Sequence, residues 1–556
     1  MKRLFEKKYR LAAILVTVVS AAFISAGKTD FDVARNLEVL FNLFREVSMN
    51  YVDETDPDDL MKKAAAGMLS NLDPYTEFLS EDDMERFEVM TTGKYGGIGS
   101  LIRQQGEWVV IAQPYKGFAA DKAGLKIGDK ILAINGVDMK NASTETVSGQ
   151  MKGDPGTTLR LTVERFTDGT VEELELKRER IAISGVAYYG MVNDSVGYIA
   201  HNDFTDECSG DIRDAIMELK KQGMKSLVYD LRENGGGIMQ EAVAIVGMFV
   251  PRESEVVSIR GRSERGAVYK SQASPIDRDM PVAVLINRNS ASAAEIVAGA
   301  LQDYDRAVIV GQRSFGKGLV QSPKSLGYNN YVKLTTAKYY IPSGRCIQAI
   351  DYSHRNEDGG VSYVPDSLVR EFQTRNGRKV YDGGGIMPDR TTGFHTYNIF
   401  TAALYRKNYM EDFAMEYIRR QGFRPVDVDA FRLDDAAYAE FAAFMQDKEV
   451  EYESETKMAL ELLKKTAEKE QFGDRIQAEI DALAEKIIKN KDAELARLKP
   501  EISALIEDEI ILYYHYSQGV IRHNLSGDES LNNAVEVLGN REEYNRILST
   551  QDTRRN

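Results

Sequence analysis

Two serines stand in a segment whose pattern would place one of them at the start of a helix. The run VAVLIN, residues 282–287, is typical of a buried strand, a tight turn with Ser290 and Ser292 follows, and residues 293–301 are typical of a helix. At a helix N-terminus, free backbone N–H groups and the helix dipole stabilise developing negative charge. A helix cap is the commoner role of such a serine, so this segment alone favours a cap.

A lysine between two glycines follows further along the chain. A single lysine is usually a solvated surface charge, but the glycines on either side of Lys317 allow close backbone approach and could bring its side chain inward. A lysine that accepts a proton must be neutral, which requires burial to lower its pKa from about 10.4. The apolar neighbours Phe315 and Leu319 are compatible with such burial.

Three successive glycines, residues 235–237, end an apolar strand-like run and precede a helical pattern. Their bare backbone N–H groups would suit an oxyanion hole or another anion site. The spacing GxxxxGK[ST] of a phosphate-binding loop is absent, and an isolated triplet is not diagnostic.

The patterns around these segments predict several structural units, because 556 residues exceed one ordinary core. Helical periodicity runs from Val33 to about Val89, and short alternating strands separated by glycine turns fill the range from Gly93 to about Ile181. Apolar β-branched runs then alternate with helical stretches, which indicates parallel strands with crossover helices. From about Tyr397 onward the pattern is helical, and the charged stretch 468–510 favours a bundle or hairpin.

Composition excludes some functions. The net charge of -15 offers no basic stripe, so we expect no nucleic-acid partner. Cys208 and Cys346 show no metal-site spacing, and a disulfide between them is neither required nor excluded. The five histidines are scattered outside the glycine- and serine-rich segments, which argues against a Ser-His-Asp triad.

The first residues, MKRLFEKKYR, carry several positive charges and precede an apolar run from Leu11 to Ala26. This layout predicts export, through a cleaved signal or a retained N-terminal anchor. We therefore expect a periplasmic protein in a cell with two membranes, either soluble or anchored to the inner membrane.

Together these segments resemble the carboxy-terminal processing peptidases, or tail-specific proteases, a Ser/Lys family with a crotonase-like core and a PDZ domain. The resemblance runs from about Leu37 to Asp389. The matching motifs are NYVDETD, GMLSNLDPYTEFL, KYGGIG, DKAGLKIGDKILAING, DLRENGGG, SASAAEIVAGALQDYDRAVIVGQRSFGKGLVQ, KYYIPSGRCIQ and VYDGGGIMPD.

The resemblance implies a role for individual residues. The nucleophile falls on Ser292, the general base on Lys317, 25 residues later, and the residue that orients the lysine on Gln321. The implied oxyanion donors are the backbone N–H groups of Gly235 or Gly236 and of Ala293. No metal or organic cofactor is needed for such acyl transfer.

The resemblance also implies that the PDZ domain binds carboxy-terminal tails. Its carboxylate-binding loop matches Tyr95, Gly96, Gly97 and Ile98, although a simple turn would also explain these glycines. Lys152 stands where relatives often carry an arginine linked to sensing of bound peptide; the charge is kept but the bidentate geometry is lost.

Two further positions depart from the family pattern without removing a catalytic group. Ala294 stands where the family often has another serine. Asn289 stands where it often has glycine, and asparagine tolerates the left-handed conformation better than most residues.

The predicted fold class is multidomain α+β: a crotonase-like α/β protease core with an inserted β-rich PDZ domain and helical terminal regions. The predicted boundaries are 1–27 for the signal or anchor, 28–90 for the helical N-terminal region, 91–182 for the PDZ domain, 183–395 for the protease core and 396–556 for the helical C-terminal region.

The expected substrates are proteins or peptides with flexible, apolar carboxy termini, and the helical regions could bind an adaptor protein or form a homo-oligomer. Two other interpretations are a catalytically inactive exported PDZ scaffold and a crotonase-like acyl-CoA enzyme. The intact serine, lysine and glutamine argue against the scaffold, and the export signal and PDZ domain against the acyl-CoA enzyme.

Overall fold

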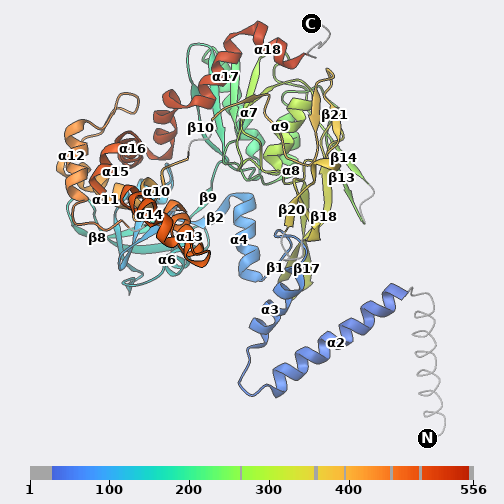
Figure 1. The fold of residues 1–556 in the computed structure, drawn as a ribbon, viewed down its shortest axis with the longest axis horizontal. Coiled ribbons are helices and arrows are strands. Elements are labelled where there is room, and N and C mark those ends of the chain that lie inside the picture. The colour runs from blue at the N-terminus through green and yellow to red at the C-terminus, as the bar shows by residue number, and fades with distance from the viewer. Residues whose placement is uncertain are drawn as a thin grey trace. The chain divides into compact units, whose positions relative to one another are not determined.

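The computed structural model describes residues 28–262, 266–355, 361–393, 396–450, 452, 455–487 and 491–549. The signal or anchor expected at residues 1–27 lies outside this range. The chain divides into two compact units (Figure 1). One contains the described residues up to Glu81 together with Ser322–Thr335, and the other contains the remainder.

The first unit consists of helices and a short strand pairing. α2 (Lys28–Asn50) and α3 (Pro57–Leu69) lie in the range predicted to be helical. β1 (Glu77–Leu79) pairs antiparallel with residues 331–333 of β18 (Asn330–Tyr340). Leu37 and Phe41 on α2 are 60% and 65% exposed, so the described residues leave an apolar face of this helix uncovered.

The second unit begins at Asp82, within α4 (Glu81–Thr92), and continues into the β-rich region. The four strands predicted from glycine-bounded alternating runs are present as β3, β4, β5 and β7, and their inward side chains, such as Ile111 and Leu161, are fully buried. The main sheet has the order β3-β4-β5-β7-β8, with β3 at one edge. The elements are β2 (Lys94–Gly97), β3 (Ser100–Gln105), β4 (Trp108–Pro114), α5 (Ala119–Lys122), β5 (Lys130–Ile134), β6 (Val137–Asp138), α6 (Thr144–Met151), β7 (Thr158–Glu164), β8 (Val171–Lys177) and β9 (Glu179–Ala182).

A six-stranded sheet of order β10-β11-β12-β15-β16-β23 forms the α/β core; only the pairing of β10 with β11 is antiparallel. The apolar runs SLVYDL, VAVLIN and AVIVG become β12, β15 and β16, as predicted. The strands are β10 (Val186–Met191), β11 (Val196–His201), β12 (Ser226–Asp230), β15 (Val282–Ile286), β16 (Val308–Gly311) and β23 (Arg390–Thr391).

Helices cover both faces of this sheet. Alternate residues of a strand point to opposite faces, and on β15 Val284 packs with α7 (Cys208–Lys221), α8 (Met239–Val246) and α9 (Ala293–Asp303), whereas Leu285 packs with α17 (Glu529–Gly539) and α18 (Arg541–Leu548). The C-terminal helices α17 and α18 therefore supply the third layer of the core.

Part of a second sheet, formed by β13 (Glu255–Gly261), β14 (Ala267–Lys270) and the end of β18, belongs to the same unit, and β13 contacts α9. β13 pairs with β14 and with residues 337–340 of β18. The remaining strands are β17 (Leu319–Gly327), β19 (Ile350–Arg355), β20 (Val361–Tyr363), β21 (Glu371–Gln373) and β22 (Lys379–Tyr381).

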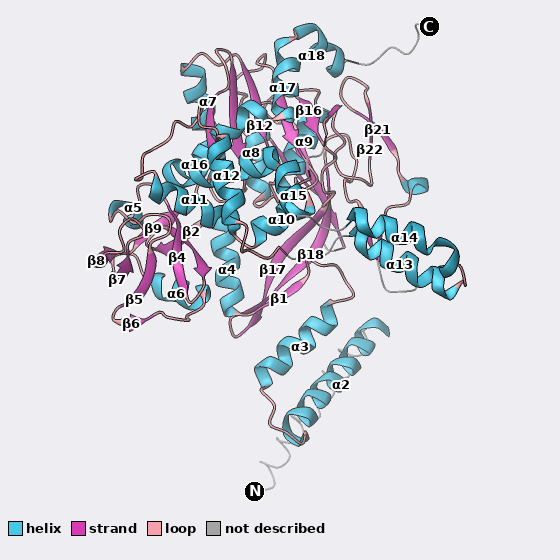
Figure 2. Ribbon diagram, turned by 60° about the vertical axis from the view of Figure 1, so that its left-hand side comes forward, coloured by secondary structure: helices cyan, strands magenta, loops and turns pink. Residues whose placement is uncertain are grey.

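The predicted helices after Tyr397 are present. Their apolar residues form a cluster of their own, which Ile127 and Phe166 of the β-rich region join. α13 and α14 lie side by side as a hairpin (Figure 2), in which Ala467 and Ile480 are buried but Leu462 is 65% exposed. The helices are α10 (Ile399–Arg406), α11 (Tyr409–Arg420), α12 (Asp435–Phe444), α13 (Glu455–Lys469), α14 (Gly473–Ile487), α15 (Lys491–Arg497) and α16 (Lys499–Asn524).

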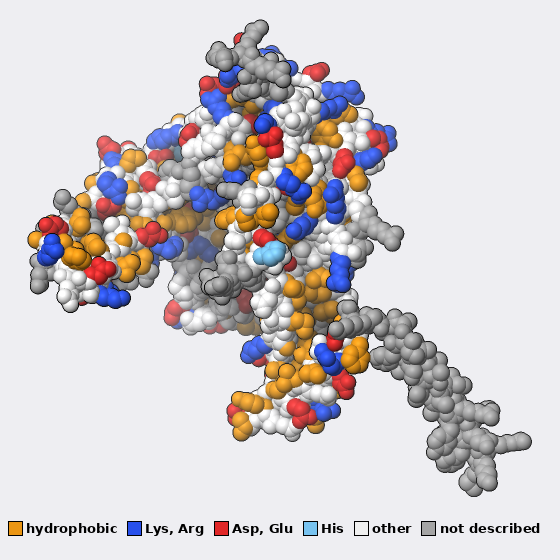
Figure 3. Space-filling model, turned by 45° about the vertical axis from the view of Figure 1, so that its right-hand side comes forward, with side chains coloured by type: hydrophobic (Ala, Val, Ile, Leu, Met, Phe, Trp, Pro, Cys, Tyr) orange, Lys and Arg blue, Asp and Glu red, His pale blue; other side chains and the backbone are white. Residues whose placement is uncertain are grey.

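In the part of the chain that the structure describes, no helix combines the length and apolarity that a membrane span requires. On the face drawn in Figure 3, basic and acidic side chains are interspersed rather than separated into a basic stripe.

Candidate active site

The two serines of the β15–α9 turn have different environments. Ser290 is fully buried, and its hydroxyl donates to the carbonyl oxygen of Leu231 at 2.7 Å and accepts from the N–H of Asn287 at 2.9 Å. Ser292 is the N-cap residue of α9 and has a φ of 56° and a ψ of -114°. A serine in such a strained conformation at a strand-to-helix turn is typical of nucleophilic serines. Ser290 instead stabilises the turn through its two hydrogen bonds.

A buried carboxylate joins the serine segment to the lysine segment. Glu295, in the first turn of α9, accepts from the backbone N–H of Ser292 at 2.9 Å and of Lys317 at 2.8 Å through Oε2. Its Oε1 accepts from the N–H of Gly316 at 2.7 Å and the hydroxyl of Ser314 at 2.5 Å. One side chain therefore fixes the backbones at both predicted catalytic positions.

Burial raises the pKa of Glu295 to about 7, although its four hydrogen-bond donors oppose this shift. An ionised carboxylate is an acceptor only, so the ionised form is the one that satisfies all four donors. The predictions from sequence did not include Glu295. The signal that could have identified it is the pattern Ser-x-x-Glu at the start of a helix, which is the signature of a capping box.

The segment around Lys317 depends on its glycines, as expected. Gly316 has a φ of +87°, and a Cβ placed on it would lie 2.4 Å from the Cβ of Ala349. The N–H of Gly318 donates to the side-chain oxygen of Gln348 at 2.7 Å, and the Tyr339 hydroxyl donates to the carbonyl oxygen of Lys317. Only a residue without a side chain fits at position 316.

Gln321 lies on β17, which begins at Leu319. Lys317 lies two residues before this strand, so the four-residue spacing to Gln321 is not a helical turn, and the orienting role of Gln321 stays a prediction.

The glycine triplet lies against the nucleophile turn. Gly236 has a φ of +101°, and a Cβ on it would lie 2.7 Å from the Cβ of Ser292 and 3.0 Å from the nitrogen of Ala293. The N–H of Gly236 donates to Oδ1 of Asn234 at 2.8 Å. Gly235 is exposed, and no atom lies within 4 Å of the place where its Cβ would be. The N–H of Gly236 is thus engaged within the loop while Gly235 is exposed, and which of the two donates to an oxyanion stays a prediction.

Asn234 holds this loop from inside. Its side chain is fully buried, donates to the carbonyl oxygen of His201 at 2.7 Å and accepts from Gly236, while its own carbonyl oxygen accepts from the N–H of Ala291 at 2.9 Å. The sequence pattern contained no indication of this role.

His201, at the end of β11, is also fully buried. Its Nδ1 lies 2.5 Å from the hydroxyl of Tyr229 and its Nε2 lies 2.9 Å from the carbonyl oxygen of Asp203. Burial lowers its pKa to about 4, which keeps the ring neutral at pH 7. With both ring nitrogens engaged, this histidine supports the loop.

The predicted carboxylate-binding residues lie on and just after β2. Tyr95, Gly96 and Gly97 pair antiparallel with β9, and Ile98 is buried. A Cβ on Gly96 would lie 2.1 Å from the carbonyl oxygen of Gly153, so that close approach requires glycine.

Lys152, the C-cap residue of α6, places its ammonium 5.7 Å from the centre of the Tyr95 ring. A positive charge therefore lies beside β2. Both α6 and the edge strand β3 lie in the same small domain and contact each other.

Cys208 and Cys346 are both free thiols, and among the described residues no group of three or more His, Cys, Asp or Glu side chains is arranged to hold a metal ion.

Comparison with known proteins matches three segments to family models. Residues 195–354 match Peptidase family S41, residues 88–164 match the PDZ domain, and residues 400–538 match the C-terminal helical domain of probable PDZ-proteases. These matches confirm the predicted fold class of an α/β protease core with a PDZ domain and a helical C-terminal region.

Two relatives that match over most of their length are proteases of the same kind. A probable CtpA-like serine protease of Staphylococcus aureus is 32% identical over 362 residues, which cover 62% of this chain and 72% of that protein. A carboxy-terminal-processing protease of Bartonella bacilliformis is 35% identical over 335 residues, covering 59% of this chain and 74% of that protein.

Among solved structures, the photosystem II D1 C-terminal processing protease is 27% identical, with a TM-score of 0.34, and the match covers 63% of this chain and 85% of that one. The family resemblance seen in the sequence is thus confirmed by the curated relatives. The chain belongs to peptidase family S41, as a serine protease of the carboxy-terminal processing family that carries a PDZ domain.

Proposed function

We propose that the chain is an exported endopeptidase in which Ser292 is the nucleophile and Lys317 the general base. The observation that supports this assignment most directly is the Glu295 carboxylate, which accepts hydrogen bonds from the backbone N–H of both residues. A buried acceptor shared by two segments fixes their relative position, as a nucleophile and its base require.

In the proposed reaction, neutral Lys317 takes the proton of the Ser292 hydroxyl as the serine oxygen bonds to the carbonyl carbon of the substrate. The backbone N–H groups of Gly235 and Ala293 stabilise the resulting oxyanion. The C–N bond then breaks, and the amine leaves with the proton from Lys317. Water, deprotonated by the same lysine, hydrolyses the acyl-enzyme, and Gln321 orients the lysine throughout.

The PDZ domain would select substrates by their carboxy termini. We assign the terminal carboxylate to the β2 residues Tyr95, Gly96 and Gly97 and to Ile98, with Lys152 nearby, and the peptide chain to the free edge of β3. The preferred substrates are proteins with apolar, unstructured tails.

The remaining proposals concern cell location and assembly. The N-terminal segment would direct export to the periplasm, and the domain boundaries would follow those predicted from the sequence. The uncovered apolar face of α2 is compatible with a homo-oligomer or an adaptor protein.

A cleavage assay with matched substrates tests the proposal. An unfolded protein with a free carboxy terminus and its amidated twin are incubated with wild type, Ser292→Ala and Lys317→Ala. The control is Lys324→Ala, which removes an exposed lysine on the same strand as Gln321. We expect wild type and Lys324→Ala to cleave the free tail, the two catalytic variants to lose activity by at least about 1,000-fold, and the amidated twin to be cleaved more slowly.

Equal cleavage by wild type and the two catalytic variants would overturn the Ser292/Lys317 assignment. Equal cleavage of the free and amidated tails would overturn the assignment of carboxylate recognition while leaving the dyad intact.

A further inference from the structure

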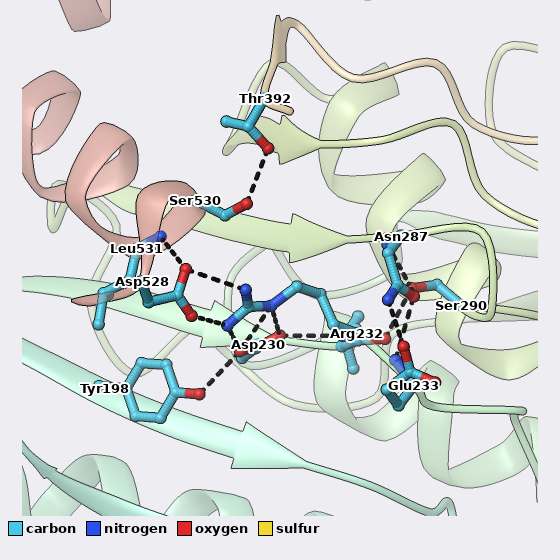
Figure 4. Close-up of polar contacts among 11 residues, drawn as sticks. Tyr198, Asp230, Arg232, Glu233, Asn287, Ser290, Thr392, Asp528, Ser530 and Leu531 are labelled. Carbon is cyan, nitrogen blue, oxygen red and sulfur yellow. Dashed lines mark hydrogen bonds and ion pairs between the residues drawn. The ribbon is translucent and has the colours of Figure 1, made fainter. Parts of the chain in front are cut away.

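The loop that carries Gly235 begins at Arg232, whose guanidinium lies between two carboxylates (Figure 4). Asp230, at the end of β12, accepts from Arg232 Nε at 3.0 Å and from Nη2 at 2.5 Å, and it also accepts from the hydroxyl of Tyr198 at 2.7 Å. Asp528 accepts from Nη1 at 3.0 Å and from Nη2 at 2.5 Å. Charge-assisted pairs on two sides therefore fix the orientation of this arginine.

Asp528 comes from the C-terminal helical region. It is the N-cap residue of α17, where its Oδ1 also accepts from the N–H of Leu531 at 2.9 Å. Leu531 is fully buried against the core sheet, and the hydroxyl of Ser530 is hydrogen-bonded to that of Thr392 at 2.7 Å. The carboxylate is thus held rigidly by its own helix, independently of Arg232.

The residue after Arg232 is clamped to the nucleophile turn. Glu233 has a φ of 58°, and its carboxylate accepts from the side-chain amides of Asn287 at 2.6 Å and Asn289 at 2.7 Å. Both asparagines belong to the turn that precedes Ser292, so Glu233 ties the loop to that turn. Because Arg232 and Glu233 are both held by their partners, the loop that continues into glycines 235–237 has little freedom to move.

We propose that Asp528 is a positioning residue for peptide hydrolysis: its ion pair with Arg232 holds loop 231–237 so that the N–H of Gly235 faces the oxyanion formed at Ser292. The proposal rests on the function proposed above. It assigns to the C-terminal helical region a part in the chemical step.

Removal of the Asp528 charge should move the loop without unfolding it. Asp230 remains as a partner for the arginine, so Arg232 does not become an unpaired buried charge. The guanidinium is instead drawn toward Asp230 alone. The asparagine of an Asp528→Asn variant retains an oxygen that can cap α17, because asparagine is as good an N-cap residue as aspartate.

The test compares full-length wild type, Asp528→Asn and a matched control, Glu536→Gln. Glu536 also lies on α17 and pairs with a core arginine, Arg390, at 2.9 Å, but this pair is not part of loop 231–237. With the free-tail substrate we expect Asp528→Asn to lower kcat by about 10- to 100-fold with KM within about twofold, because an oxyanion contact acts in the transition state. Glu536→Gln should keep the wild-type kcat.

Two further readouts separate positioning from loss of folded protein. The endpoint of labelling by a fluorophosphonate probe should be the same in Asp528→Asn as in wild type, while its rate falls. Backbone hydrogen exchange of the peptide spanning 231–238 should be faster in Asp528→Asn than in wild type or Glu536→Gln.

The proposal is overturned by an Asp528→Asn variant with wild-type kcat, by a labelling endpoint that falls in proportion to kcat, or by unchanged exchange in residues 231–238. Failure of the underlying function would look different: wild type itself would not cleave, or Ser292→Ala would cleave equally. The exchange measurement needs no substrate and shows even then whether Asp528 holds loop 231–237.

Discussion

At the scale of single residues, Glu295 connects the segments that carry the proposed nucleophile and the proposed base. Its side chain is fully buried and holds the backbones of Ser292 and Lys317 through one oxygen. A displacement of about 1 Å in an active site can cost about 100-fold in rate, so this carboxylate should matter for catalysis although it need not touch the substrate.

We therefore expect Glu295→Gln to lower kcat/KM by about 100-fold. The amide replaces one acceptor with an NH2 group, which would face donors from the nucleophile or the lysine segment. The control is Asp303→Asn on the same helix, a similarly buried carboxylate that pairs with Arg345. Steady-state kinetics normalised to titrated active sites give the comparison; equal kcat/KM losses in the two variants would contradict the role of Glu295.

His201 should make the folded state sensitive to acid. The unfolded chain binds a proton near pH 6.5, but the folded chain binds it only near pH 4, because burial lowers the pKa of this histidine. The unfolded state thus binds more protons between these values, so stability present above pH 6.5 is lost as the pH falls toward 4, by up to about 3 kcal/mol.

Urea unfolding of wild type and His201→Gln across this pH range provides the measurement. As the pH falls from 6.5 to 4, the free energy of unfolding of wild type should fall more than that of His201→Gln. Parallel curves for the two proteins would be inconsistent with a buried neutral histidine.

The sequence predicted Ser292 and Lys317 because their motifs are local and ordered along the chain. It did not predict the role of Asn234, whose side chain accepts from the N–H of Gly236 and donates to the carbonyl oxygen of His201 on a neighbouring strand. It also missed His201, which comes close to the loop only when β11 and β12 pair.

At the scale of elements, the glycine loop and the nucleophile turn pack backbone against backbone. Gly236→Ala should lower activity by at least about 100-fold, because the new Cβ would lie 2.7 Å from that of Ser292 and the φ of +101° disfavours alanine. Gly210→Ala on α7 is the control, since no atom lies within 4 Å of its Cβ position. The cleavage rates and melting temperatures of both variants are measured. A Gly236→Ala protein that cleaves at the wild-type rate would contradict the prediction, because it would show that the loop can move away from Ser292.

The strands and helices of the core could be predicted from the sequence because each pattern is local: β-branched apolar runs for β12 and β15, and helical periodicity for α9. The pairing of β18 with β1 over residues 331–333 and with β13 over residues 337–340 could not, because it depends on long-range register.

At the scale of the whole chain, the C-terminal region packs against two parts of the second unit, the β-rich region and the core sheet. Phe166 of the β-rich region packs into the apolar cluster of α11 and α16, and Arg419 stacks over its ring at 4.7 Å. α17 and α18 instead cover the protease sheet, and the hydroxyl of Tyr544 accepts from the N–H of Val282 at 3.1 Å. Helical periodicity predicts that these helices exist but not which surface each one covers.

A deletion of residues 525–556 should therefore prevent folding of the protease core, because Tyr198, Val228 and Leu285 would lose their apolar cover. Replacing hairpin 455–487 by a short glycine-serine linker is the matched control, since among the hairpin side chains that the structure describes only Ala467 and Ile480 are buried. Solubility and limited proteolysis of the two proteins measure the outcome. A soluble, protease-resistant protein after the first deletion would mean that α17 and α18 are dispensable for the core.

The most direct test of the mechanism is to locate the reactive residue itself. Wild type, Lys317→Ala and Ser292→Ala are treated with a fluorophosphonate, digested, and mapped by mass spectrometry. We predict a label on Ser292 in wild type, labelling at least about 100-fold slower in Lys317→Ala, and no label at this position in Ser292→Ala. A wild-type label on Ser290 or elsewhere, or an undiminished rate in Lys317→Ala, would contradict the assignment of Ser292 as nucleophile and Lys317 as base.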